Sequence, residues 1–87
     1  MDADPYASLK ARLDEGHVWP ALYTFKFIMK SDVLDGFVTI LEGHRFTTRA
    51  SASGRHVAIT AELFVETSDE VIAVYRRAAE FPGVISL

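Results

Sequence analysis

Residues 45–66 read RFTTRASASGRHVAITAELFVE, a run in which small or apolar side chains alternate with polar ones around a Ser53-Gly54 pair. Alternation with a period of two is typical of a β-strand that buries one face. Gly54 can adopt the positive φ of a tight hairpin turn, so we expect two antiparallel strands joined by a two-residue loop, with Ala52 opposite Arg55. The other elements of the chain are then expected to cover this hairpin.

The register of the hairpin assigns its side chains to two faces. The small and apolar face pairs Ala50 with Val57, Thr48 with Ile59, and Phe46 with Ala61. The polar face pairs Ser51 with His56, Arg49 with Ala58, Thr47 with Thr60, and Arg45 with Glu62. We expect the first face in the core and the second outside it, because a shift of one residue would exchange the two faces throughout.

The composition is that of one small globular domain. The chain has 87 residues, 49% hydrophobic and 24% charged, with no cysteine and a net charge of −3. The lack of cysteine excludes disulfide scaffolds and thiolate metal or redox sites. The acidic balance argues against a nucleic-acid partner, whose binding needs clustered Lys and Arg. With no apolar run near the ~20 residues of a membrane helix and an acidic N-terminus, we expect a cytoplasmic protein with no membrane partner.

A short helix is expected at the N-terminus. Asp4 can accept hydrogen bonds from its free amides, and Pro5 suits its first position. The helix ends near Gly16, and its apolar stripe consists of Tyr6, Leu9 and Leu13. Isolated helices of this length are marginal in water, so residues 1–18 are predicted to form an arm that docks on the domain of residues 19–87 or on a partner chain.

A strand and a second helix are expected between the arm and the hairpin. Residues 21–30 alternate, and their apolar face consists of Tyr23, Phe25, Phe27 and Met29. Ser31 is then the predicted cap of a helix that ends at Gly43. The buried face of this helix is predicted to consist of Val33, Leu34, Phe37, Ile40 and Leu41.

A third helix and a last strand follow the hairpin. Thr67 and Glu70 match a capping box, and Pro82-Gly83 ends the helix. Its apolar stripe consists of Val71, Val74, Tyr75 and Ala78, and Arg76 is placed to pair with Glu80. Residues 84–87 form the strand. The order after the first helix is therefore β-α-β-β-α-β, an α+β ferredoxin-like sandwich with two helices on one face of a four-stranded antiparallel sheet.

Several stretches resemble the YbeD-like family of small bacterial proteins, whose fold is similar to the ACT regulatory domain. The matching stretches are Trp19-Pro20-Ala21, Thr24-Phe25-Lys26, residues 48–60, residues 71–75 and residues 83–87. The resemblance implies the ferredoxin-like fold for residues 19–87. It implies no catalytic residues, but ACT-like proteins often act as regulatory modules that dimerise or bind small ligands.

The strongest candidate site lies on the polar face of the sheet. It consists of Lys26, Arg49, Ser51, His56 and Thr60, with Thr24, Arg45 and Glu62 nearby. Because three permanent cations gather on one side of a net-acidic chain, this face could bind an anionic ligand or an acidic partner surface. The alternative is a solvated or self-associating face whose charges keep the strands soluble.

No residue pattern predicts catalysis, a metal site or a cofactor. The three histidines, His17, His44 and His56, lie in different elements without metal-ligand spacing. Ser51 and His56 are the one nucleophile–base pair that the register brings together, and no carboxylate is placed to orient the imidazole. The chain has no Asn for an acylphosphatase-like site, and the central strands lack the stacking aromatics of an RNA-binding sheet.

Two functions are compatible with these patterns. The first is a small non-enzymatic regulatory or protein-interaction module that self-associates or docks on another protein through its open sheet face. The second is a sensor of a small anionic metabolite, of ACT type, with the ligand at the dimer junction near the start of the helix that follows Ser31.

Overall fold

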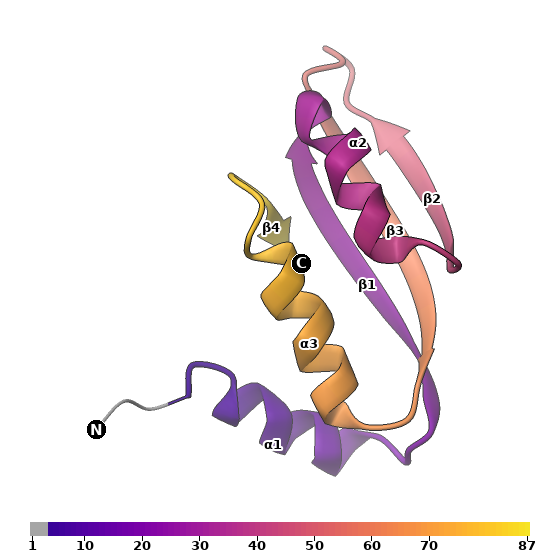
Figure 1. Cartoon of the computed structure of the whole chain (residues 1–87), viewed down its shortest axis with the longest axis vertical. Coiled ribbons are helices and arrows are strands. Elements are labelled where there is room, and N and C mark those ends of the chain that lie inside the picture. Colours follow the sequence, from indigo (N-terminus) through magenta and orange to yellow (C-terminus); the bar gives the residue numbers. More distant parts are fainter. Residues whose placement is uncertain (1–3) are drawn as a thin grey trace.

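Strand β3 (His56–Val65) lies between two antiparallel neighbours, β1 (Ala21–Lys30) and β2 (Arg45–Ala50). The short strand β4 (Ile85–Ser86) pairs with the other side of β1, so the sheet order is β2-β3-β1-β4. This computed structural model describes residues 4–87 (Figure 1), and residues 1–3 of the predicted arm lie outside the described residues. The ferredoxin-like α+β arrangement is confirmed.

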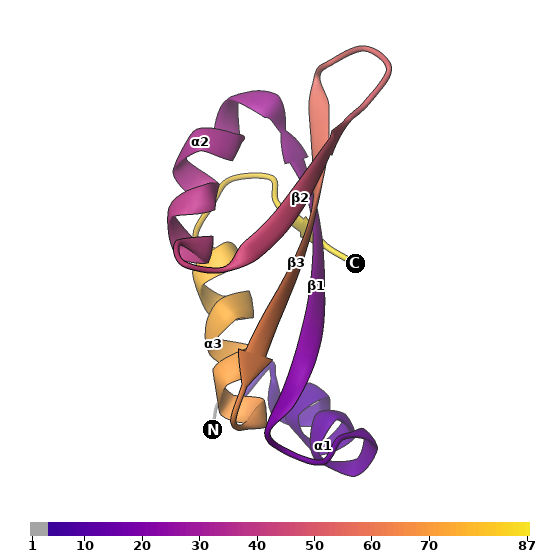
Figure 2. The same cartoon turned by 90° about the vertical axis from the view of Figure 1, so that its right-hand side faces the viewer.

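The helices α2 and α3 form one layer on one side of this sheet (Figure 2). Helix α3 (Ser68–Ala78) follows β3, and the segment between β1 and β2 contains the short helix α2 (Leu34–Phe37). Between them and the sheet lies the core. Its largest fully buried side chains are Phe25, Phe27, Met29, Phe37, Leu41, Ile59 and Val71. The predicted apolar faces of β1 and β3 are therefore confirmed from Phe25 onward.

Aromatic contacts connect the sheet to both helices. The ring centroids of Phe27 and Phe37 are 5.0 Å apart, and those of Phe25 and Tyr75 are 5.2 Å apart. Both pairs are edge-to-face, the geometry that aromatic quadrupoles favour. These contacts fix where α2 and α3 lie over β1, and thereby leave the opposite face of the sheet uncovered by them.

The apolar face of β2 is not in the core, contrary to prediction. All six of its residues are exposed, including Phe46 at 36%. The reason is its position, since β2 is an edge strand and Figure 2 shows the end of the β2–β3 hairpin projecting beyond α2. The pairing itself is as predicted: every pair from Arg45 with Glu62 to Ala50 with Val57 is present.

The hairpin turn is longer than the predicted two-residue loop, and the placement of Ala52 opposite Arg55 is wrong. The Ser51 amide donates to the His56 carbonyl at 2.8 Å, and the Gly54 amide donates to the Ser51 carbonyl at 2.9 Å. The four residues between Ser51 and His56 therefore form the loop, with Gly54 at a φ of 74°. The register survives because both kinds of loop leave Ser51 opposite His56.

The predicted helix after Ser31 is broken into three pieces. They are two 3₁₀ turns, η1 (Ser31–Val33) and η2 (Val38–Leu41), on either side of α2. Ser31 does not cap this segment, since its hydroxyl donates to the Gly54 carbonyl at 2.6 Å. Gly36 is a poor helix former, and the Thr39 hydroxyl bonds to its carbonyl oxygen. The predicted burial of Phe37 and Leu41 is confirmed.

Helix α3 begins as predicted, because the Thr67 hydroxyl accepts a hydrogen bond from the Glu70 amide at 3.3 Å. The return bond of the capping box differs, since the Glu70 carboxylate accepts from the Glu66 amide. The predicted Arg76–Glu80 pair is replaced by an ion pair of Arg76 with Asp4, at 3.0 Å. The partner of Arg76 is therefore Asp4 in the N-terminal arm instead of Glu80, which lies one helical turn away.

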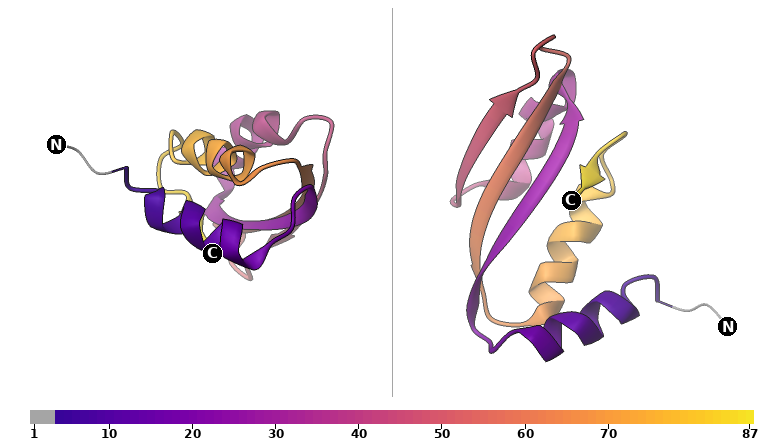
Figure 3. Two further views of the ribbon diagram at one scale, coloured as in Figure 1. Left: turned by 90° about the horizontal axis from the view of Figure 1, so that it is seen from below. Right: turned by 180° about the vertical axis from the view of Figure 1, so that it is seen from behind.

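The arm forms helix α1 (Ala7–Gly16), which packs across the N-terminal half of α3 (Figure 3). The helix begins at Ala7 instead of Pro5, because the Asp4 carboxylate bonds to the Tyr6 amide in the turn before it. The predicted stripe is confirmed: Leu13 is buried, and Tyr6 and Leu9 pack against the core.

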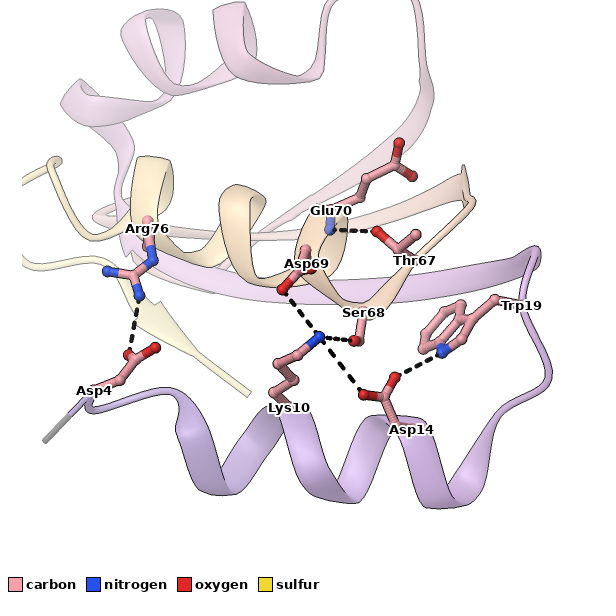
Figure 4. A network of polar contacts seen from close by, with 9 residues as sticks. All are labelled: Asp4, Lys10, Asp14, Trp19, Thr67, Ser68, Asp69, Glu70 and Arg76. Carbon is pink, nitrogen blue, oxygen red and sulfur yellow. Dashed lines mark hydrogen bonds and ion pairs between the residues drawn. The ribbon is translucent and has the colours of Figure 1, made fainter.

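Hydrogen bonds and ion pairs of Lys10 connect α1 to the start of α3 (Figure 4). The Lys10 ammonium lies 2.9 Å from the hydroxyl of the buried Ser68, 3.0 Å from the Asp69 carboxylate and 3.6 Å from that of Asp14. The indole N–H of Trp19 donates to Asp14 at 3.0 Å. The hydroxyl of Ser68, the indole of Trp19 and the charge of Lys10 lower the pKa of the Asp14 carboxyl below its usual value.

Replacing Asp14 should therefore change how stability depends on pH. A carboxyl whose pKa is lowered by folding stabilises the protein above its unfolded-state pKa, and this contribution disappears as the pH falls through the folded-state value. We expect Asp14→Asn to lower the melting temperature near neutral pH, and the difference from the wild type to vanish in strong acid. Fluorescence of Trp19, the single tryptophan, reports the transition. Melting curves that stay equally separated across the acid range would contradict this assignment.

Candidate functional site

The candidate site is the sheet face that points away from α2 and α3, here called the open face. Its side chains form rows across the strands, because residues paired in register lie side by side. Three rows join β1, β3 and β2: Thr24, Glu62 and Arg45; Lys26, Thr60 and Thr47; Ile28, Ala58 and Arg49. The next row holds Lys30, His56 and Ser51. The face thus has a charged and polar middle.

All five predicted site residues lie on or beside the open face. Lys26 and Thr60 are direct neighbours, Arg49 lies one row further along, and His56 and Ser51 close the series at the hairpin loop. Rows on one face are about 7 Å apart, since two residues separate them. The structure therefore places the five along one surface and does not gather them around a single point.

Ser51 and His56 are adjacent, and the contacts of the Ser51 hydroxyl are with backbone and loop atoms. The Ser51 hydroxyl accepts from the backbone amide of His56 at 3.2 Å and lies 3.3 Å from the Ser53 hydroxyl. In the part of the chain that the structure describes, the imidazole of His56 makes no hydrogen bond. A general base must reach the proton that it abstracts, so the hydroxyl here stabilises the loop instead.

Two shallow hollows border the hairpin loop. One, of about 230 Å³, is mainly apolar and is lined by Ile28, Arg49, Ala50, Ser51, His56, Val57 and Ala58. The other, of about 460 Å³, is lined by the charged and polar residues Lys30, Ser31, Asp32, Arg55 and His56. The second hollow lies where β1 leads into η1, and it brings together the cationic side chains Lys30 and Arg55 beside His56.

Lys30 and Arg55 were missed by the sequence analysis. Lys30 ends β1, and it reaches the hollow only because β1 pairs with β3 so that Lys30 lies opposite His56. Two further bonds fix the loop there, from the Ser31 amide to the Arg55 carbonyl at 2.9 Å and from the Ser31 hydroxyl to Gly54. Local sequence patterns do not show which distant strands pair. Only a predicted order of the strands could therefore have indicated that Lys30 lies beside the hairpin loop.

Apolar side chains were also missed at both ends of the open face. Leu22 and Phe64 are direct neighbours at one end and are 59% and 65% exposed. Ile85 lies beside Ile28 on the far edge and is 58% exposed. Large apolar side chains side by side on a surface often mark a site of protein interaction.

A third hollow, of about 400 Å³, lies between α1, α3 and β4. It is lined by Tyr6, Leu9, Tyr75, Ala78, Ala79, Val84, Ser86 and Leu87. Nearby, the hydroxyls of Tyr75 and Tyr23 are 3.2 Å apart, and burial together with this contact raises the pKa of Tyr75 well above its usual value. The Tyr75 hydroxyl therefore stays protonated at any physiological pH.

Residues 4–87 contain no group of three or more His, Asp or Glu side chains that could hold a metal ion. None of the helices in that part of the chain combines the length and apolar character needed to cross a bilayer.

A family model described as "Protein of unknown function (DUF493)" matches residues 14–87. No curated protein and no solved structure matches the chain. The matched range covers the whole sheet together with α2 and α3, and it begins within α1.

Removing the Ser31 hydroxyl should loosen the loop beside both hairpin hollows. We expect Ser31→Ala to lower the free energy of unfolding by about 1 kcal/mol, the usual net contribution of one hydrogen bond. Urea denaturation measures this loss, and amide exchange should quicken at Gly54 and Arg55. Ser8→Ala, at an exposed position of α1, is the matched control and should not lower stability. Equal stabilities for the two variants would show that the Ser31 bond is not formed in solution.

Proposed function

The chain belongs to the DUF493 family, to which YbeD-like proteins also belong, and from that premise we propose that it is a small non-enzymatic regulatory or protein-interaction module. The resemblance seen in the sequence is confirmed, but the family description names no activity. The proposal therefore depends on the site. It is supported above all by the open face, which α2 and α3 leave uncovered.

The composition of the open face favours a protein partner. Exposed apolar pairs at its ends can bury area on association, and the cations between them can orient the contact. Protein interfaces commonly combine an apolar part with such polar surroundings. The binding roles of Lys26, Arg49, Ser51, His56 and Thr60 are part of this proposal, as are self-association and a cytoplasmic location.

The arrangement also supports the non-enzymatic part of the proposal. The one nucleophile–base pair on this face is bonded through backbone and loop atoms, and the hollows beside it are shallow. Binding, in contrast, needs only an accessible surface with complementary chemistry. We therefore assign the open face a role in assembly.

Self-association through the open face can be tested with the chain alone. We expect the solution mass to rise above the 9.7 kDa of one chain as concentration increases. Lys26→Glu and Phe64→Ser should each raise the dissociation constant about tenfold or more, since a reversed charge in the middle of the interface or a lost aromatic anchor at its end costs on the order of 1–2 kcal/mol. Sedimentation over a concentration series measures this.

Arg12→Glu, an exposed charge reversal on α1, is the control and should leave the dissociation constant unchanged. A constant mass of one chain at all concentrations would contradict self-association. Association that persists in both open-face variants would show that another surface is responsible.

A second candidate function rests on the polar hollow at the start of η1. Two cations, Lys30 and Arg55, line it together with one carboxylate, Asp32, and the net positive charge suits a small anionic metabolite carrying a carboxylate or phosphate group. Ligands that bind only the folded state raise its stability. We expect a panel of such metabolites to include one that raises the melting temperature of the wild type but not that of a Lys30→Ser, Arg55→Ser double variant. Equal shifts in both proteins, or none in the wild type, would exclude this site.

A further inference from the structure

Strand β2 is an open edge of the sheet along its whole length. It pairs with β3 on one side only, and all six of its residues are exposed. The Ser51 amide bonds to β3, and in an antiparallel ladder the residues that point toward the partner alternate with those that point away. Arg45, Thr47 and Arg49 therefore bond to β3, while the amides and carbonyls of Phe46, Thr48 and Ala50 point outward.

The side chains along this edge are charged on one face and apolar on the other. Arg45 and Arg49 lie on the open-face side with Thr47 between them. Neither arginine forms an ion pair with any residue from 4 to 87. Phe46 lies on the opposite face and is partly exposed. The edge of β2 thus has outward-pointing amides and carbonyls, with two unpaired arginines on one face and the aromatic ring of Phe46 on the other.

We propose that β2 binds an extended acidic segment of a protein partner, which adds to the sheet as a further strand beside it. Such strand addition draws affinity from main-chain hydrogen bonds and specificity from alternate side chains. The proposal rests on the proposed function, because it names the chemistry of the partner of this interaction module.

Charge decides which strand the edge accepts. Pairing β2 with β2 of a second copy would place Arg45 and Arg49 of both chains on one short stretch, and like charges across a pair of strands are destabilising. Charged side chains on an edge also discourage neutral strands from pairing with it. An acidic strand would be attracted by Arg45 and Arg49. The two arginines therefore favour an acidic strand over β2 of a second copy and over a neutral strand.

The geometry also gives the sequence pattern of the partner. Residues opposite Arg45 and Arg49 occupy non-hydrogen-bonded positions, where paired side chains lie closest, so these two should be Asp or Glu. The residue opposite Phe46 should be apolar. An antiparallel partner therefore reads acidic, any, any, apolar, acidic from its N-terminus.

A labelled peptide containing Thr-Glu-Val-Thr-Val-Glu tests this pattern, with fluorescence anisotropy at low ionic strength as the measurement. We expect binding to weaken about tenfold when both Glu are replaced by Gln, and by a similar factor in an Arg45→Glu, Arg49→Glu double variant. Added salt should weaken binding as well, because the charges are exposed.

Methylated peptides separate strand addition from simple attraction of charges. Methylation of the amide nitrogens of both Val residues removes the groups that face Phe46 and Thr48, and should weaken binding about thirtyfold. Methylation of the second Thr and the last Glu, whose amides point away from β2, is the matched control and should change it little. Equal effects of the two methylations would overturn the proposal, as would absence of binding by the unmodified peptide.

The same samples distinguish failure of this inference from failure of the proposed function. Self-association measured without peptide tests the proposed function, while Arg12→Glu, an exposed change on α1 away from the sheet, is the control and should leave peptide binding within about twofold. Peptide binding that depends on Lys26 instead of Arg45 and Arg49 would overturn the edge as the binding site.

Discussion

The pairing of β1 with β3 is the constraint on which the rest of the structure depends. These strands are in register from Ala21 with Val65 to Lys30 with His56. Their inward side chains supply most of the core, so the helices have one surface on which to pack. Their outward side chains supply the middle of the open face. A single ladder thus sets both the packed side of the molecule and the side available to partners.

The sequence was most informative where neighbours in space are neighbours along the chain. The β2–β3 register follows from a turn and an alternating pattern, so it could be predicted pair by pair even though the loop type was wrong. The bond from Ser31 to Gly54 could not, because it joins residues far apart along the chain and replaces the helix cap that Ser31 was predicted to form. Arg76 shows the same limit: its observed partner, Asp4, lies at the other end of the chain.

Much of the candidate site could be predicted for the same reason. Arg49, Ser51, His56 and Thr60 share one face through the local hairpin register, and Lys26 joins them because it alternates with the apolar residues of β1 in the predicted ferredoxin-like sheet. The contributions of Lys30, Leu22 and Phe64 required the β1–β3 register, which depends on packing across the whole domain. The exposure of β2 required knowing how far the helical layer extends over the sheet.

The way α1 is attached has a consequence for how this chain can vary. Leu13 is its one buried side chain, and the Lys10 and Arg76 contacts that hold it are partly exposed ion pairs and hydrogen bonds. The strands of the sheet pair with one another without α1, so this segment joins the domain through one core side chain and a few polar contacts at the surface. A helix that took the place of α1 would therefore need an apolar side chain at the position of Leu13 and a cation at the position of Lys10.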